Sequence, residues 1–274
     1  MATNQMRREA AKRKLERQQE RRMQQARRRR QVAVITSAVV VVVVLVGVVV
    51  LGSLGGDDPA TDPAAAQPTA TAPGEPVSCE YPAGGEPAKP VQAPPTEDVA
   101  TEGTVTVTLR TGAGEIPLTL DRAAAPCTVN SFVSLTEQGY FDGTPCHRLT
   151  TGEGLKVLQC GDPSGAGTGG PGYTIPDEPP TDLPPAEGQP GAVTYGRGLV
   201  AMAKTAAPNS GGSQFFLVYG DSTLPPEYTV FGRIGEPGLG VLDQVAAAGL
   251  AEGGRPGDGA PAAPVTIEAA TLAG

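Results

Sequence analysis

Residues 144–178 read TPCHRLTTGEGLKVLQCGDPSGAGTGGPGYTIPDE, and the rest of the chain is organised around this stretch. It contains the only histidine, His147, the adjacent Arg148 and two of the four cysteines. The segments CHRL and LKVLQC are compatible with short β-strands, and TTGEG between them indicates a hairpin that places Arg148 and Gln159 on one shared face. The glycine-rich run that follows cannot continue as a helix or a strand, so it predicts a long ordered loop.

Two later segments complete a recognisable pattern. MAKTAAPNSGGSQFFLV occupies 202–218 and LPPEYTVFGRI occupies 224–234. Together with the His-Arg strand, Gln-x-Gly-Asp and GTGGPGY, in this order, they resemble the cyclophilin-type peptidyl-prolyl cis-trans isomerases. Several separated motifs in one order are far more specific than any single motif. The resemblance covers residues 101–274, which would form one isomerase domain.

The amino-terminal region has a different composition. Residues 1–31 contain twelve Lys or Arg and three Glu, whereas the remainder contains nine basic and 26 acidic residues. Val-rich residues 32–51 carry no charge and are long enough to cross a bilayer, so we expect a transmembrane helix within 32–54. Basic residues precede this helix only, which predicts a single-pass protein with a cytoplasmic N-terminus and an extracytoplasmic domain.

The composition of this region has two alternative explanations. A cleaved signal peptide would have a shorter charged part and a shorter apolar part. Nucleic-acid binding would suit the arginines of 1–31, but this segment has no aromatic residue for base stacking and adjoins the apolar helix. We therefore expect the basic segment to set membrane topology and contact anionic lipid heads, and we expect no nucleic-acid partner.

Residues 55–100 are rich in Pro, Ala, Thr and Gly and have few large apolar side chains. Such a segment buries too little surface to offset its ordering entropy, so it predicts a flexible linker. Cys79 and Tyr81 are exceptions and are candidates for docking on the domain. The abundance of alanine, glycine and proline, with the Val-rich anchor, is typical of a bacterial chain.

The domain pattern is mostly β. Residues 105–109 and 115–120 alternate around a glycine turn, and further strands are expected at 146–149, 156–160, 199–203, 214–218, 228–234 and 265–272. Helices are expected from Pro126 to Gly139 and over 239–248. Many strands with two helices favour an antiparallel barrel or sandwich. The resemblance implies the closed eight-stranded antiparallel barrel, capped by two helices, of the cyclophilins.

Isomerisation of a prolyl bond makes and breaks no covalent bond, so it needs no cofactor, metal or nucleophile. The obstacle is amide resonance, with a barrier of about 18–20 kcal/mol. An apolar pocket for the ring and a donor aimed at the prolyl nitrogen are sufficient. A single histidine without Cys-x-x-Cys gives no support to a zinc site, and the glycine run lacks the ending of a phosphate loop.

The resemblance assigns roles to individual residues. Arg148 would be the catalytic arginine, Gln159 the glutamine that orients it, and Phe216 the floor of the proline pocket. Substrate-binding positions would be Val157, Ala203, Lys204, Leu224 and Tyr228. Without the resemblance, Arg148 and Gln159 could be polar residues of a solvated strand, and the apolar residues could belong to the core. His147 is expected to be structural.

The four cysteines allow three pairings. Cys146 and Cys160 lie on the two arms of the expected hairpin, where cross-strand partners come within bridging distance. This pairing would leave Cys79 for Cys127, which would tie the end of the linker to the first helix. Two disulfides fit a domain outside the cytoplasm.

The function expected from these observations is prolyl isomerisation that assists the folding of exported, proline-containing polypeptides at the cytoplasmic membrane. A second hypothesis is a binding module that uses the same pocket without useful turnover. It stays open because residues 150–157 depart from the family pattern, with Leu155, Lys156 and Val157 in place of its usual Phe-Met pair. A third possibility is an adhesion or scaffold protein.

Overall fold

The computed structural model describes residues 74–273. The basic segment 1–31, the expected transmembrane segment 32–54 and the first part of the linker lie outside these residues. Within the described part of the chain, no helix combines the length and the apolar character needed to cross a bilayer.

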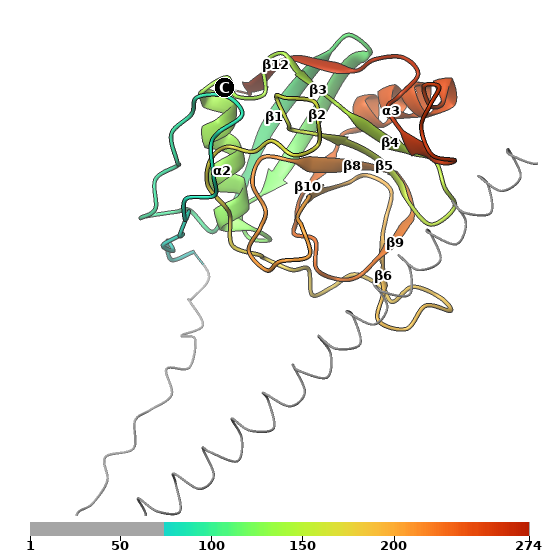
Figure 1. Ribbon diagram of the computed structural model, residues 1–274. Coiled ribbons are helices and arrows are strands. Elements are labelled where there is room, and N and C mark those ends of the chain that lie inside the picture. The colour runs from blue at the N-terminus through green and yellow to red at the C-terminus, as the bar shows by residue number, and fades with distance from the viewer. Residues whose placement is uncertain (1–73, 274) are drawn as a thin grey trace, which may run out of the picture. The chain divides into compact units, whose positions relative to one another are not determined.

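The described residues form short strands and two helices (Figure 1). The helices are α2 (Pro126–Glu137) and α3 (Glu236–Ala248). The strands are β1 (Thr104–Thr111), β2 (Gly114–Asp121), β3 (Thr144–Pro145), β4 (Arg148–Thr150), β5 (Lys156–Cys160), β6 (Val193–Tyr195), β7 (Leu199–Met202), β8 (Phe215–Gly220), β9 (Ser222–Leu224), β10 (Val230–Ile234), β11 (Asp258–Gly259) and β12 (Thr266–Leu272).

Ten of these strands form one antiparallel, curled sheet in the order β11-β4-β5-β8-β7-β10-β2-β1-β12-β3, while β6 pairs with β9. The prediction of a closed eight-stranded barrel is wrong, because β11 and β3 end the sheet. The strand expected at 146–149 starts only at Arg148, as β4, which pairs with β5 and β11, while the preceding β3 pairs with β12. Pro145 has no backbone N–H for a ladder, and Cys146 and His147 lie between the two short strands, so no continuous ladder closes the sheet.

The strands that carry the site are buried on both faces. Along β8, Phe215 and Leu217 belong to the main core, whereas Phe216 and Val218 belong to a second apolar cluster on the opposite face. The same alternation divides β5 and β7, as expected for side chains of period two. The main core also contains residues of both helices, such as Phe132 of α2. The site is therefore built on the face of the sheet that turns away from this core.

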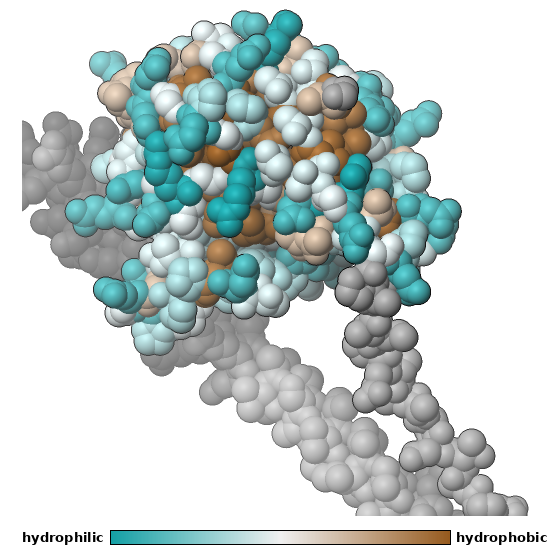
Figure 2. Space-filling model, turned by 180° about the vertical axis from the view of Figure 1, so that it is seen from behind, coloured by the Kyte–Doolittle hydropathy of each residue, from teal (hydrophilic) through white to brown (hydrophobic). Residues whose placement is uncertain are grey.

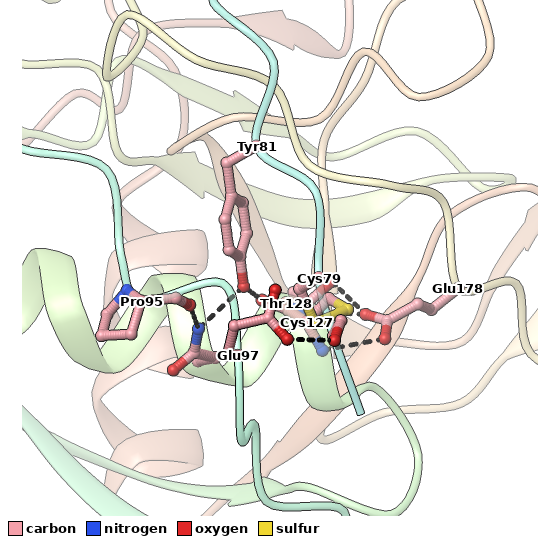
Figure 3. The surroundings of a disulfide bond; sticks show 9 residues. Cys79, Tyr81, Pro95, Glu97, Cys127, Thr128 and Glu178 are labelled. Carbon is pink, nitrogen blue, oxygen red and sulfur yellow. Dashed lines mark hydrogen bonds between the residues drawn. A yellow bond between two sulfur atoms is a disulfide. The ribbon is translucent and has the colours of Figure 1, made fainter. Parts of the chain in front are cut away.

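Helix α2 starts at Pro126, a favoured first helical residue, and ends before Gly139, whose φ is 64°. Its preceding residue provides no side-chain cap. Instead Glu178, far away in sequence, accepts hydrogen bonds of 2.9 Å from the backbone N–H groups of Cys127 and Thr128 (Figure 3). A carboxylate at this end also interacts favourably with the helix dipole.

Residues 74–100, named the strap here, lie against the domain. The backbone N–H groups of Gly84, Ala88 and Thr174 donate hydrogen bonds of 2.9 Å that join residues 82–88 to 170–174. Lys89 Nζ donates to the carbonyl of Gly139 at the end of α2, at 2.6 Å. The expectation of a flexible linker over 55–100 is thus corrected for the strap, because backbone hydrogen bonds and a disulfide offset its ordering entropy.

Both proposed disulfides are confirmed. Cys79 pairs with Cys127 and Cys146 with Cys160, with Cα–Cα distances of 5.5 and 4.0 Å. Tyr81, the other expected docking residue, donates from its hydroxyl to the carbonyl of Cys127 at 2.9 Å (Figure 3). The first disulfide therefore fixes the strap to α2.

The surface is hydrophilic over much of the face shown in Figure 2, with apolar residues visible between the polar ones. Residues 74–273 contain 23 acidic and nine basic residues. The few basic side chains in this acidic domain are consequently informative about where a specific positive charge is placed.

Candidate active site

Three site residues and Ala201 form one row across the sheet. Arg148 of β4 lies opposite Gln159 of β5, which lies opposite Phe216 of β8, which lies opposite Ala201 of β7. Directly paired residues project from the same face. The expectation that Arg148 and Gln159 share a surface is confirmed by this register.

A pocket of about 180 Å³ opens beside this row. All eight predicted catalytic and substrate-binding residues border it, together with Leu155, which was not among them. The lining consists of Arg148, Leu155, Val157, Gln159, Ala203, Lys204, Phe216, Leu224 and Tyr228. The sequence pattern therefore located one pocket, and the chemical role of each residue stays a prediction.

The pocket is apolar at its base and aromatic on one side. Phe216 is 5% exposed, and its ring contacts Tyr228 edge to face, with centroids 5.7 Å apart. Buried Tyr195 supports this side, because its hydroxyl accepts a hydrogen bond from the backbone N–H of Tyr228 and lies 3.2 Å from the carbonyl of Pro225. Burial raises the pKa of Tyr195 to about 12, so the hydroxyl keeps its proton.

Arg148 supplies the positive charge at the rim. Its Nε and Nη2 donate to the two carboxylate oxygens of Asp258, at 2.7 and 2.9 Å. Its Nη1 donates to Gln159 Oε1 at 3.1 Å. The hydrogen bond to Asp258 raises the pKa of Arg148 above its already high ordinary value, so the guanidinium is charged at every working pH.

Gln159 links Arg148 by hydrogen bonds to the lining of a second, larger pocket. Its Nε2 donates to Gln214 Oε1 at 2.9 Å, and Gln214 Nε2 donates to the carbonyl of Gly169 at 3.0 Å. The second pocket, about 450 Å³, shares Gln159, Ala203 and Lys204 with the first and is bordered by the strap at Gly84 and Glu86. An extended peptide in the first pocket can therefore continue into the second.

The glycine-rich loop is held by Asp162. This carboxylate is fully buried and accepts hydrogen bonds from the backbone N–H groups of Ser164, Thr168 and Gly169, at 2.8 to 3.0 Å. Burial alone would raise the pKa of Asp162, but the hydrogen bond from the Ser164 hydroxyl, followed by those from backbone N–H groups of the loop, outweighs it and lowers the pKa below its ordinary value. A Cβ atom at Gly169 would lie 2.1 Å from Asp162 Oδ1, so only glycine fits there.

Lys204 does not offer a free cation to a ligand. Its Nζ lies 2.6 Å from Asp177 Oδ2, and its side chain is 9% exposed. Ala203 likewise has its N–H bonded to the carbonyl of Gln214, at 2.9 Å. Among the cations that border the pocket, Arg148 is the more exposed one and has N–H groups to spare.

The disulfide between Cys146 and Cys160 lies beside the two central polar residues. Cys160 follows Gln159 directly, and Cys146 is two residues before Arg148. The bond joins the two arms of the β4–β5 hairpin. It therefore fixes the hairpin register that makes Arg148 and Gln159 neighbours.

Sequence reasoning missed four contributors: Leu155, Tyr195, Gln214 and Asp258. Gln214 precedes Phe216 by two residues, so the period of a strand could have indicated its side of the sheet. Asp258 had no such signal, because it is 110 residues from Arg148 in a Gly-Pro loop that resembles a simple turn. Among residues 74–273, no group of three or more His, Cys, Asp or Glu side chains could hold a metal ion.

The comparisons with known proteins agree with this geometry. The family described as "Cyclophilin type peptidyl-prolyl cis-trans isomerase/CLD" matches residues 106–272. A probable peptidyl-prolyl cis-trans isomerase B of Mycobacterium leprae is 54% identical over 202 residues, which are 72% of this chain and 67% of the relative. The corresponding Mycobacterium tuberculosis protein is 52% identical over 202 residues, 72% of this chain and 64% of its own length. This chain thus spans about two thirds of these relatives.

Solved structures show the same fold. A crystal structure of a Cryptosporidium parvum cyclophilin type peptidyl-prolyl cis-trans isomerase has a TM-score of 0.51 and 26% identity, and the match covers 63% of this chain and 99% of that chain. A second structure of that protein, in the presence of the dipeptide Ala-Pro, has a TM-score of 0.50 with 26% identity over 62% of this chain and 99% of that one.

Proposed function

We propose that the 180 Å³ pocket binds the proline ring of a polypeptide and that Arg148 drives the isomerisation. The chain belongs to the cyclophilin-type peptidyl-prolyl cis-trans isomerase family. Proline-containing polypeptides are the substrates, which is consistent with the related structure obtained with Ala-Pro. The observation that carries the proposal is the position of a charged guanidinium at the rim of a pocket with an aromatic floor.

The apolar side of the pocket selects and holds the ring. The pyrrolidine lies on Phe216, between Val157, Leu155 and Leu224, where it displaces water. Tyr228 closes the pocket next to Phe216. With the ring fixed, rotation about the prolyl bond moves the preceding part of the peptide, so the enzyme stabilises a twisted geometry instead of a planar one.

Arg148 acts on the nitrogen that changes during this rotation. In the planar amide the nitrogen lone pair is delocalised, and the bond has a barrier of about 18–20 kcal/mol. When the bond twists, the lone pair localises on the nitrogen and can accept a hydrogen bond from a guanidinium N–H. This interaction is stronger in the transition state than in either isomer, which is the condition for catalysis. Gln159 orients the guanidinium through Nη1.

The activity can be measured with a peptide that contains Ala-Pro, by the exchange between its cis and trans signals in NMR. The full-length chain with intact disulfides should accelerate this exchange, and Phe216→Ala should weaken peptide binding. An unchanged exchange rate with folded, oxidised protein would contradict the proposed function and would favour a proline-binding module.

We further propose that the domain works outside the cytoplasmic membrane on exported polypeptides, anchored by residues 32–54. All cysteines among residues 74–273 are in disulfides, which fits an oxidising compartment. The uncharged residues 32–51 and the excess of basic residues before them support the same orientation.

Topology is tested in intact cells with cysteine substitutions at exposed positions. Labelling by a membrane-impermeant maleimide is expected for Glu187→Cys and absent for Ala2→Cys. Labelling of the amino-terminal position alone would reverse the orientation, and labelling of neither in intact cells but of both after lysis would place the whole chain inside.

A further inference from the structure

The guanidinium of Arg148 is clamped from the side opposite to Gln159. Asp258 Oδ1 lies 2.7 Å from Nε, and Oδ2 lies 2.9 Å from Nη2. This parallel, two-point contact fixes the plane of the guanidinium as well as its position. The side chains are 36% and 34% exposed, so the pair lies at the pocket rim and not in the core.

The clamp decides which donors are left for a substrate. A guanidinium has five N–H groups. Two of them go to Asp258 and one to Gln159. One N–H on Nη1 and one on Nη2 have no further acceptor among residues 74–273, and Arg148 borders the pocket with them. Asp258 therefore binds the Nε–Nη2 edge of the guanidinium and leaves one N–H on Nη1 and one on Nη2 for a substrate.

The backbone holds Asp258 firmly in place. Asp258 pairs with Thr150 and Gly259 with Leu149, so β11 is attached to the strand that carries Arg148. A tight turn precedes it, in which Arg255 and Asp258 exchange backbone hydrogen bonds of 2.9 and 3.0 Å. The carboxylate is therefore preorganised, and the guanidinium adapts to it.

The stability of the fold does not explain this contact. Ion pairs that solvent reaches contribute little to folding, since solvent screens them and long side chains lose entropy. A second two-point pair, Arg197 with Asp243 at 2.8 and 2.8 Å, joins α3 to the segment before β7, away from the pocket. Both pairs are two-point contacts, but Asp258 binds Nε and Nη2 of its arginine, whereas Asp243 binds Nη1 and Nη2, and only Arg148 borders the pocket.

We propose that Asp258 is the positioning residue of the isomerase: it holds Arg148 so that its free N–H groups face the prolyl nitrogen. The proposal rests on the proposed function and adds to it that catalysis requires Asp258, a residue of a loop distant in the sequence. Small displacements of a catalytic group can cost up to about a hundredfold in rate. We expect loss of the clamp to lower catalysis by about tenfold while peptide binding, which depends on the apolar lining, changes little.

The test compares Asp258→Ala with Asp243→Ala in the full-length, oxidised chain. Peptide binding is measured by NMR titration, and catalysis by cis–trans exchange of the same Ala-Pro peptide. Asp258→Ala should reduce the exchange rate at saturation by about tenfold with little change in Kd, and Asp243→Ala should stay within about twofold of wild type. Equal rates for the two variants, or a loss of binding alone, would overturn the proposal.

Two further measurements separate positioning from folding. In an Arg148→Ala background, Asp258→Ala should have no additional effect, because Asp258 acts only through Arg148; an additive loss would overturn the proposal. If Asp258→Ala does not fold, Asp258→Asn replaces it.

The second measurement is hydrogen exchange. In wild type the Arg148 Nε–H should exchange slowly with solvent, and in the Asp258 variant it should exchange faster. If the wild type does not accelerate cis–trans exchange of the peptide, the proposed function fails, while the Nε–H signal still reports whether Asp258 fixes Arg148.

Discussion

Arg148 and Gln159 face each other across the β4–β5 ladder, and Arg148 Nη1 donates a hydrogen bond of 3.1 Å to Gln159 Oε1. Since Gln159 also donates to Gln214, its amide connects the guanidinium to the loop of the second pocket. The Gln159 amide therefore links the lining of the first pocket to that of the second.

The substitution Gln159→Leu keeps the size of this side chain and removes both hydrogen bonds. We expect kcat/KM to fall by about tenfold in the exchange assay, because Arg148 loses one of its two supports. The matched control is Gln138→Leu, which breaks the hydrogen bonds of an exposed glutamine to Gln92 and Ser134 near the end of α2. Similar activity in both variants would show that Gln159 does not orient Arg148.

The two disulfides should have separable effects. Replacing either pair with alanines should reduce the free energy of unfolding by roughly 2–5 kcal/mol. Loss of Cys79–Cys127, which spans 48 residues, frees the strap and leaves the hairpin intact. Loss of Cys146–Cys160, which spans 14, loosens the ends of the hairpin that carries Arg148.

Denaturant unfolding and exchange assays distinguish these effects. The Cys146→Ala, Cys160→Ala variant should lose isomerase activity at a temperature where it is still folded, while the Cys79→Ala, Cys127→Ala variant should retain it. The reverse order of activities would contradict the structural account of the hairpin.

Glu178 replaces the missing cap of α2 (Figure 3). It receives hydrogen bonds from two backbone N–H groups and from the Thr128 hydroxyl, at 2.7 to 2.9 Å. Glu178→Ala should lower the free energy of unfolding by about 1–3 kcal/mol, because these buried donors lose their acceptor. Glu187→Ala, at an exposed position, should change it by less than about 0.5 kcal/mol. Equal effects in urea unfolding would refute the capping role.

His147 makes stability depend on pH. Burial lowers its pKa below the ordinary value; Asp162 opposes this shift, and Arg148 adds to it. Its Nδ1 is buried and has no hydrogen-bond partner among the described residues. As pH falls below about 6.5, the unfolded chain takes up a proton before the folded one does, so the free energy of unfolding decreases until the folded pKa is reached.

The prediction is checked by urea unfolding at pH 7.5 and pH 5 for wild type and His147→Asn. The wild type should lose more stability than the variant over this range, since carboxylates contribute equally to both. NMR titration of the only imidazole gives the folded pKa directly. A folded pKa at or above 6.5 would contradict the prediction.

The strands and helices were predictable where apolar residues alternate regularly. The β1–β2 hairpin and α2 follow their patterns closely, and α3 begins only a few residues before Leu239. The position of the pocket followed from the resemblance of the motifs around Arg148 and Phe216 to the cyclophilin family, because their chemistry alone fits a solvated strand or the core as well. The disulfide between Cys146 and Cys160 followed from hairpin geometry.

Features that depend on distant contacts were not predictable. The composition of the strap predicts a flexible linker because it has few large apolar side chains to bury, and only its hydrogen bonds to residues 170–174 reveal its order. Cys146 and His147, expected in a strand, lie outside one, because β3 before them pairs with β12 and β4 after them pairs with β5 and β11. Asp258 reaches Arg148 only through the β11–β4 pairing, which the sequence of a glycine-rich loop does not encode locally.

The most direct test of the account is the cis–trans exchange rate of an Ala-Pro peptide with wild type, Arg148→Ala and Arg148→Lys, each full length, oxidised and folded by circular dichroism. We expect clear acceleration by wild type and a loss of about a hundredfold or more in Arg148→Ala. Arg148→Lys should not restore the rate, because an ammonium cannot keep Asp258, Gln159 and the prolyl nitrogen in one plane. Undiminished activity in a folded Arg148→Ala variant would contradict the central claim.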